Sequence, residues 1–386
     1  MSTTLIEKEK PAVSNEASRN WMEAAERIAA VIAAEAAEHD ADDSFVARGY
    51  QLLKDEGLMK ACVPVEFGGY GATISEMCAV IRKLGASCGS TALAFAMHTH
   101  MVATAAWRFK HQKAPTDGLL KRVAAENLVL VSSGGSDWLK SAGTAVKVEG
   151  GFNITATKVF ASGSPVGDIL MTSAVHDDPQ AGPTVLHFGV PLKAKGVTVK
   201  SNWRAMGMRG TGSNDIELKD VFVADAAIAG KRPQGKWHPL FHIISMIAFP
   251  IIYSAYLGVA EGARARAIAL AKKRAGDEGT AYLVGEMENA FYSAEVIHAD
   301  MIRVAETCQP GPETTNRIMI ARTQMAGHAI RTIECAMEAA GGVAFYRDTG
   351  IERAFRDVQG ARFHPLQAKP QLRYTGRLAM GLDIDG

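Results

Sequence analysis

Hydrophobic positions recur with a helical period over the first part of the chain, from about Ser14 to Ala125. Apolar side chains stand at i, i+3, i+4 and i+7 from Trp21 onwards, with Glu and Arg between them. The segment 63–71 is too rich in glycine to continue a helix. Helical patterning resumes at 73–84 and again at 91–109. We therefore expect an N-terminal helical region interrupted by one short glycine-rich loop.

The pattern changes between about Asn127 and Asp225. Short apolar runs typical of strands are separated there by Gly or Asp/Pro turns, and no long helical pattern lies between them. An antiparallel sandwich or barrel therefore fits this region better than βαβ units. The expected strands are 129–131, 144–148, 152–156, 169–172, 184–188 and 216–223.

Helical patterning returns from about Pro239 to Leu382. Four long helices are expected, at roughly 240–274, 279–308, 312–340 and 350–381. The most apolar stretch, 243–260, is interrupted by polar residues and a proline, so it is interpreted as a buried helix rather than a membrane span. The expected fold class is mainly α with a central β domain. The expected domain limits are 1–126, 127–232 and 233–386.

Composition and charge exclude several classes of protein. The 386 residues are 47% hydrophobic and 22% charged, which is ordinary for a chain that buries a core. The formal net charge of +1 argues against a dedicated nucleic-acid binder. The first ten residues lack the apolar run of a signal peptide. The five cysteines form no CxxC pair, so neither a disulfide framework nor a zinc site is indicated. A cytoplasmic protein without a bound metal, a nucleic-acid partner or a membrane anchor is expected.

Polar candidates for chemistry gather in the β region. The segments 131–137 and 158–164 each follow a strand and are rich in serine and glycine. Ser132 and Ser162 are suited to hydrogen-bond the edge of a flat heterocycle, because a hydroxyl both donates and accepts. The loop 203–215 carries clustered glycines and Arg209, which suits an anionic group. Serine and glycine also make ordinary turns, and that alternative stays open for all three segments.

Five stretches, in this order along the chain, together resemble the acyl-CoA dehydrogenase superfamily. Segment 63–71 matches its P-x-x-x-G-G-x-G loop, and 132–137 resembles the first signature of its β domain. Ser162 falls at the last position of its W-I-[TS] motif, where Phe160 replaces the tryptophan. Segment 206–223 resembles its G-x-R-g-[ST] loop and the following strand. Gly341–Gly342 and 351–357 resemble its G-G…E-R-x-x-R-D segment.

This resemblance implies an N-terminal helical domain, a middle β-barrel and a C-terminal four-helix bundle. FAD, with FMN as the alternative, would lie between barrel and bundle, with its ring edge near Ser132 and Ser162. Members are usually homotetramers in which the Gly-Gly segment touches a neighbour's cofactor, and Arg274 falls where the family often has a flavin-phosphate arginine. The implied cofactor-binding residues are Ser132, Ser133, Ser136, Phe160, Ser162, Arg274, Glu338, Gly341 and Gly342.

The chain departs from the family where its dehydrogenases hold their catalytic base. A carboxylate in an apolar site suits removal of the α-proton of an acyl thioester, because burial raises its pKa towards neutrality. The family places this Glu either eight residues after the Arg-Asp aspartate or about ten residues before a Leu-Gly pair. These positions hold Pro365 and Ala248 in this chain.

His364 precedes the first of these positions, and Glu338 replaces the usual Gln before the Gly-Gly pair. A histidine there resembles the dibenzothiophene monooxygenase branch, in which reduced flavin captures oxygen as a hydroperoxide. The resemblance gives Ser162 and His364 the role of hydrogen-bond donors to that group, and a histidine is also suited to shuttle a proton. His98 and His100 lie about 200° apart on one helix, so only one of them can face such a site. We name His364, Ser162 and His98 as the catalytic candidates.

Three functions remain open on the sequence. The first is an oxygen-using flavin monooxygenase, which would need a flavin reductase. The second is an acyl-CoA dehydrogenase with a non-standard base, which would pass electrons to an electron-transfer flavoprotein. The third is a non-catalytic flavin- or acyl-CoA-binding protein. The substrate is expected to be a small molecule, and the residues expected to line its pocket are Trp138, Phe160, Phe249 and Tyr253.

Overall fold

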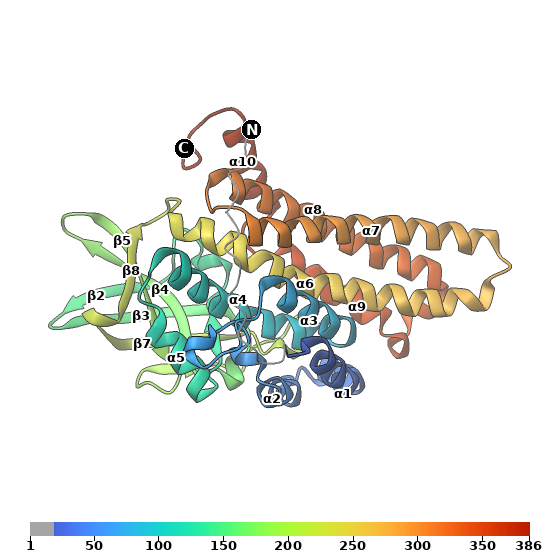
Figure 1. Ribbon diagram of the computed structural model, residues 1–386, viewed down its shortest axis with the longest axis horizontal. Coiled ribbons are helices and arrows are strands. Elements are labelled where there is room, and N and C mark those ends of the chain that lie inside the picture. The colour runs from blue at the N-terminus through green and yellow to red at the C-terminus, as the bar shows by residue number, and fades with distance from the viewer. Residues whose placement is uncertain (1–18) are drawn as a thin grey trace.

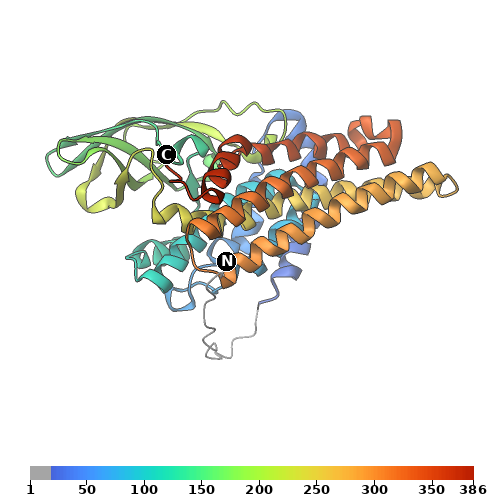
Figure 2. The same cartoon turned by 90° about the horizontal axis from the view of Figure 1, so that it is seen from above.

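The computed structural model describes residues 19–386, in which a β-sheet lies at one end and long helices extend towards the other (Figure 1). Five helices precede the strands and the longest helices follow them, so the order is helical, β, helical. The expectation that the chain begins without a signal peptide rests on residues outside the described range. The turned view shows the same separation of the sheet from the far end of the helices (Figure 2).

The helices of the N-terminal region begin at side chains that satisfy free backbone N–H groups. The Asn20 side chain accepts from Glu23 N at the start of α1, and Thr73 and Glu76 form a reciprocal capping box at the start of α3. The glycine-rich segment 63–71 separates α2 from α3, as expected. The helices are α1 (Trp21–Asp42), α2 (Ala47–Asp55), α3 (Ile74–Ser87), α4 (Gly89–Gln112) and α5 (Asp117–Glu126).

The central region forms one eight-stranded sheet in the order β6-β7-β3-β2-β4-β5-β8, with β1 paired to β4. Most pairs are antiparallel, but β1 and β2 each run parallel to β4. Within residues 19–386 no pairing joins β6 to β8, so the expected barrel is an open sheet with two edges. The strands are β1 (Leu130–Ser132), β2 (Thr144–Val148), β3 (Gly151–Ala161), β4 (Ile169–Asp178), β5 (Gly182–Pro191), β6 (Val197–Val199), β7 (Asn214–Ala224) and β8 (Ile228–Pro233).

Three of the four expected C-terminal helices are present, and the fourth is divided. Residues 363–367 break the expected helix 350–381, because Pro365 has no N–H to donate and disfavours helical backbone before it. Two short helices therefore replace one long one. The C-terminal helices are α6 (Pro239–Ala271), α7 (Glu278–Thr307), α8 (Pro312–Ala340), α9 (Ile351–Val358) and α10 (Ala368–Ala379).

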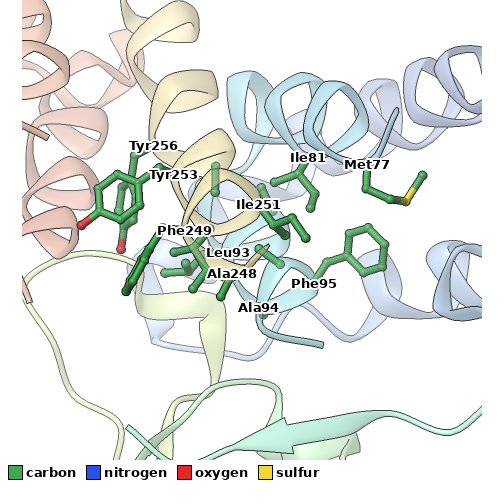
Figure 3. Close-up of a cluster of buried hydrophobic side chains, with 14 of the residues drawn as sticks. Met77, Ile81, Leu93, Ala94, Phe95, Ala248, Phe249, Ile251, Tyr253 and Tyr256 are labelled. Carbon is green, nitrogen blue, oxygen red and sulfur yellow. The ribbon is translucent and has the colours of Figure 1, made fainter. Parts of the chain in front are cut away.

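Helix α6 is the centre of the core. It is long and apolar enough to cross a membrane by length and composition, yet 94% of its most apolar window is buried in the protein. Figure 3 shows Ile251 beside Met77 and Ile81 of α3, whereas Tyr253 and Tyr256 lie on the opposite side of α6. Helices α3 and α6 approach so closely that a Cβ on Gly258 would stand 2.2 Å from Arg82 O. A larger residue at position 258 would therefore force the two helices apart.

The expected fold class, mainly α with a central β domain, is confirmed by this architecture. Six of the eight strands were expected from the sequence, and the two that were not are the edge strands β6 and β8. Edge strands pair on one side only and need less apolar sequence, which explains why their pattern is weak. The domain limits at 126 and 232 stay predictions.

Candidate active site

A cavity of about 1260 Å³ opens between the sheet, α4, α6 and the segment that joins α9 to α10. Apolar side chains such as Met101, Met171, Phe241 and Phe249 form much of its wall. A large, mainly apolar pocket with a few polar groups is typical of a small-molecule site. All three regions of the chain contribute to its wall, so the cavity exists only in the assembled fold.

Four polar side-chain atoms in the cavity wall are buried and have no hydrogen-bond partner. They are His100 Nε2, Thr104 Oγ1, Ser132 Oγ and Trp138 Nε1. An unsatisfied buried polar group costs roughly 1–3 kcal/mol, so a bound molecule is expected to supply the missing partners. A flat heterocycle with donors and acceptors along its edges, such as the ring system of a flavin, fits this requirement.

Ser162, at the end of β3, is the first member of a chain of hydroxyl groups. Its Oγ lies 2.8 Å from Ser213 Oγ, which lies 2.6 Å from Thr211 Oγ1. The Thr211 hydroxyl donates to Met208 O at 2.9 Å, so its single proton is already used. Ser213 must then donate to Thr211, and Ser162 to Ser213. The oxygen of Ser162, which lines the cavity, is therefore left as an acceptor and not as the donor that the sequence suggested.

Two of the other serines predicted near the cofactor line the same cavity as Ser162. Ser132 and Ser133 line the cavity, and Ser133 accepts a hydrogen bond from Thr172 at 3.1 Å. Ser136 belongs to a short helical turn, 135–137, whose two other residues line the cavity. Phe160 lines the cavity as well, and its ring packs against that of Trp203 in a T-shaped arrangement. The structure thus brings the β-domain candidates together on one wall.

The structure does not bring His98 into this site. Its Nε2 lies 2.8 Å from Met59 O, and its Nδ1 accepts from Leu130 N at 3.0 Å, so the backbone occupies both ring nitrogens. His100 lies on the opposite side of α4 and lines the cavity instead. Burial lowers the pKa of His100 to about 4, so its ring is neutral at physiological pH. The prediction that His98 belongs to the site is therefore corrected, because His98 does not line the cavity, whereas His100 does.

His364 lines the cavity and is held by Tyr256 of α6. The Tyr256 hydroxyl lies 2.7 Å from His364 Nε2. No other partner of this hydroxyl is present in the described part of the chain, so we assign Tyr256 as the donor, which places the ring proton of His364 on Nδ1. Burial, with the nearby Arg322 cation and His100, lowers the pKa of His364 to about 3. His364 is therefore a neutral imidazole with its Nδ1–H free to donate.

Tyr256 is a site residue that the sequence analysis missed, since it chose Tyr253. Phe249, Ile252 and Tyr256 all line the cavity, at i, i+3 and i+7 of α6. That helical period, counted from the expected lining residue Phe249, would have found Tyr256. Tyr253 turns towards α8 and does not line the cavity. Trp138 and Phe249 line the cavity as expected.

Arg322 of α8 fixes the backbone on both sides of His364. Its side chain is 1% exposed and donates to Ala361 O at 2.9 Å, to Leu366 O and to the Tyr253 hydroxyl. The guanidinium group has no carboxylate partner among the described residues. A buried cation is costly unless its donors are satisfied, and the carbonyl oxygens of segment 361–366 provide these acceptors. Arg322 thereby positions His364 without lining the cavity itself.

Asp137 is the only carboxylate that lines the cavity within residues 19–386. It pairs with the buried Lys158, whose Nζ lies 2.8 Å from Asp137 Oδ2 and also donates to two backbone carbonyls. A carboxylate held in this way is not available as a base. Pro365 and Ala248 also line the cavity, so both positions where the family's dehydrogenases keep an acid face this site without one.

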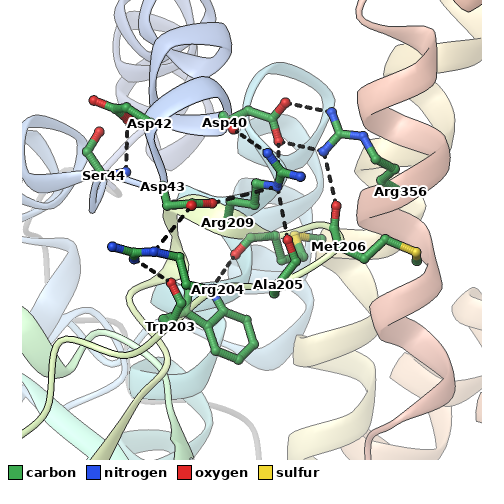
Figure 4. Close-up of polar contacts among 12 residues, drawn as sticks. Asp40, Asp42, Asp43, Ser44, Trp203, Arg204, Ala205, Met206, Arg209 and Arg356 are labelled. Atoms are coloured by element: carbon green, nitrogen blue, oxygen red, sulfur yellow. Dashed lines mark hydrogen bonds and ion pairs between the residues drawn. The ribbon is translucent and has the colours of Figure 1, made fainter.

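The loop 203–213 is held against the helices by a network of arginines and aspartates (Figure 4). Arg356 of α9 pairs with Asp40 of α1 at 2.6 Å and donates to Met206 O. Arg209 donates to Asp40 O and Ala205 O and lies 3.7 Å from a carboxylate oxygen of Asp43. Arg209 is therefore committed to protein partners and does not cradle a bound anion. Its role is to fix the loop that carries Thr211 and Ser213.

Asp357 accepts from Met208 N in the same network, and burial raises its pKa to about 6. The unfolded chain, with an Asp pKa of about 3.9, loses this proton at lower pH than the folded protein. The folded protein is therefore destabilised, relative to the unfolded chain, as pH rises from about 4 to 6. We expect the thermal midpoint of the wild type to fall relative to Asp357→Asn between pH 4.5 and pH 7.5. A difference between the two proteins that is equal at both pH values would contradict this prediction.

The remaining cofactor candidates lie at the far end of the bundle and do not line the cavity of the same chain. Arg274 follows α6 and donates to Ala339 O beside Gly341. Glu338 lies 3.6 Å from Arg331. Figure 1 shows the α6–α7 turn at the end of the molecule that is remote from the sheet. Arg274, Glu338, Gly341 and Gly342 thus form a second group, separate from the serines.

Comparisons with known proteins agree with this architecture. Models of the acyl-CoA dehydrogenase N-terminal, middle and C-terminal domains match residues 15–115, 132–221 and 251–368. The chain is 26% identical over 380 residues to the putative acyl-CoA dehydrogenase YdbM of Bacillus subtilis, covering 92% of this chain and 94% of that protein. It is 24% identical over 376 residues to the L-evernosamine nitrososynthase of a Micromonospora species, covering 92% and 88%. The FMN-bound structure of TdsC, a dibenzothiophene monooxygenase of a Paenibacillus species, superposes with a TM-score of 0.83 at 20% identity, covering 95% and 99%.

Proposed function

The chain belongs to the acyl-CoA dehydrogenase family and is a flavin-dependent oxidoreductase, and from this premise we propose that it is a monooxygenase that uses reduced flavin and oxygen. One observation carries the proposal. Four histidines line the cavity, of which His100 and His364 are neutral imidazoles near the serine wall, and within residues 19–386 no lining carboxylate is free of an ion pair. This set suits hydrogen bonding to oxygen and does not suit removal of a carbon-bound proton.

Acyl-CoA dehydrogenation is the alternative, and the similarity to YdbM favours it. It requires a base near the reacting carbon, with a pKa close to the working pH. His100, His187 and His364 do not meet this requirement, because burial lowers the pKa of His187 and His364 to about 3 and that of His100 to about 4. A base this weak would abstract an α-proton slowly. The fourth lining histidine, His238, caps α6 by accepting from Leu240 N through its Nδ1.

The wall formed by Ser132, Ser133, Phe160 and Ser162 is the part of this chain that we assign to the flavin ring. When bound, a flavin supplies two-electron redox chemistry that no side chain provides. FAD is the expected cofactor, and the FMN complexes of structural neighbours make FMN the alternative. Arg274, Glu338, Gly341 and Gly342 lie outside this cavity, so we assign them to the cofactor of a neighbouring subunit in a homotetramer.

The chain's own residues then perform three tasks. Ser162 accepts a hydrogen bond, since its proton is committed to Ser213. His364 donates from Nδ1, because Tyr256 occupies its Nε2. Apolar side chains around the two imidazoles exclude water, which strengthens these hydrogen bonds and suppresses loss of reactive oxygen species to solvent. His100 Nε2 is a further buried polar atom of the wall that has no hydrogen-bond partner among the described residues.

The proposed function implies a small-molecule substrate, an external supply of reduced flavin or electrons from a flavin reductase, and a cytoplasmic location. We expect the purified holoprotein, reduced without oxygen and then mixed with it, to form an absorbing species distinct from oxidised and reduced flavin. The measurement is stopped-flow absorbance, with hydrogen peroxide release followed in parallel. A panel of acyl-CoA thioesters should leave the oxidised flavin unbleached under anaerobic conditions.

Rapid bleaching by any acyl-CoA would instead establish the dehydrogenase function. A protein that binds flavin yet shows neither reaction would establish the third alternative, a non-catalytic binding protein. The Pro365→Glu variant is a useful companion, because it places a carboxylate where the family's dehydrogenases hold their base.

A further inference from the structure

The cavity extends beyond His100 and His364, from the β3–β7 part of the sheet towards its other edge at β5 and β8. Ser162 and Ser213 belong to the β3–β7 side, whereas the cavity also reaches β5 and β8, with β2 and β4 between the two sides. Along α4, His100, Thr104 and Arg108 line the cavity at i, i+4 and i+8. At 1.5 Å per residue, Arg108 lies about 12 Å along the helix from His100.

Positive charge gathers at this second end. Arg108 and Arg232 line it, and neither has a carboxylate partner among the described residues. Lys231, next to Arg232 on β8, is exposed, and its side chain points to the other face of the strand. Arg232 is held by Trp138 O, Leu139 O and His187 Nε2, so it is a fixed part of the wall. Arg122 lines the cavity too, but it is neutralised by Glu126 at 2.8 Å.

Arg108 is the charge best placed to act on a ligand. It is half-buried, and burial alone lowers its pKa. Within residues 19–386 its side chain makes one hydrogen bond, a 3.4 Å contact with Gln112. Arg108 and Arg232 also contribute to the lowered pKa values of His187 and His238, which shows that these groups lie within electrostatic range of one another. A partly buried cation without a counter-charge is unfavourable unless a ligand supplies that charge.

The geometry points to a substrate that carries an anionic group, such as a carboxylate, sulfonate or phosphate, bound by Arg108. An apolar body lies along Leu119, Met171 and Phe241, and the end to be oxidised lies beside His100 and His364. This inference rests on the proposed function for the choice of reacting end. The charge at the far end is a separate observation, and it can be tested without any reaction.

The test uses two probes with the same apolar body, 2-naphthoate and 2-naphthamide, in calorimetric titrations of the holoprotein. We expect the wild type to bind the anion about tenfold more tightly than the amide, and Arg108→Gln to abolish that difference. Lys110→Gln is the matched control, because Lys110 lies exposed on the same helix outside the cavity, and it should bind both probes like the wild type.

Equal affinities for the two probes in the wild type, or no detectable binding of 2-naphthoate, would overturn the inference. Equal weakening of both probes by Arg108→Gln would overturn it as well. FMN and riboflavin are titrated into the apoprotein in parallel. If Arg108→Gln weakened FMN but not riboflavin, these cations would hold the cofactor phosphate, and the inference would fail. None of these titrations needs oxygen or a reductant, so a failed oxygen reaction and a failed anion site are told apart.

Discussion

Replacing His364 with alanine is expected to lower substrate oxygenation by roughly 100-fold to 1000-fold, the range found when one catalytic donor is removed. His364 Nδ1–H is the hydrogen-bond donor of the cavity whose direction is fixed, because Tyr256 occupies the other ring nitrogen. Without it, the oxygen that would be transferred loses its donor and is expected to leave as hydrogen peroxide. The variant should therefore consume oxygen without forming product.

The measurement is the ratio of product formed to hydrogen peroxide released. Tyr256→Phe keeps the ring of His364 but removes the hydrogen bond that fixes its proton on Nδ1. We therefore expect a loss of product formation smaller than that of His364→Ala. His176→Ala is the control, because this histidine lies on β4 and does not line the cavity. Since the pKa of His364 is lowered to about 3, the wild-type rate should not titrate with this group between pH 5 and 8. An unchanged product-to-peroxide ratio in His364→Ala would contradict the assigned role.

Arg322→Met is expected to reduce product formation by about 100-fold, although Arg322 does not line the cavity. The substitution removes the donors to Ala361 O and Leu366 O that hold the segment on both sides of His364. It also removes the cation that helps to lower the pKa of His364. The pKa of His364 should rise in part, because burial, the larger cause of its lowering, remains, so the acid limb of the pH–rate profile should shift to higher pH than in the wild type.

Hydrogen exchange of residues 361–367 provides a second measurement, with faster exchange expected in Arg322→Met. Arg322→Lys keeps the charge but cannot reach all acceptors in the same geometry, so it should restore the flat pH profile and only part of the rate. Arg317→Met, on the same helix and paired with Asp300 at the surface, is the matched control. A variant with slow turnover but the wild-type pH profile and exchange would show that Arg322 does not position His364.

The order and type of the helices and strands could be predicted from the sequence, because they depend on the local periodicity of apolar residues. Helices α6, α7 and α8 have long apolar faces, and their expected limits agree with the structure to within a few residues. The fourth expected helix, 350–381, was wrong because the apolar pattern continues through Pro365 although the backbone cannot. That error matters, since the break at 363–367 is what turns His364 into the cavity.

Only some of the residues that line the cavity could be predicted from the sequence. Motif resemblance chose Ser132, Ser162 and His364, and all three line one cavity. It failed for His98, whose two ring nitrogens are used by Met59 and Leu130, residues that are distant along the chain. Nothing in the local sequence separates a histidine bonded to backbone from one that faces a ligand, because the two lie only two residues apart on the same helix.

By itself the sequence determined the order of helices and strands, the family motifs and the absence of an acid at positions 248 and 365. Each of these is a property of a single position or of residues that are close together along the chain. The tertiary structure alone decided which imidazole faces the cavity, that Tyr256 orients His364, that Arg322 holds its backbone, and that Arg108 stands uncompensated at the far end. These depend on which residues distant in the chain become neighbours, and hydrogen bonding and burial act only between neighbours in space.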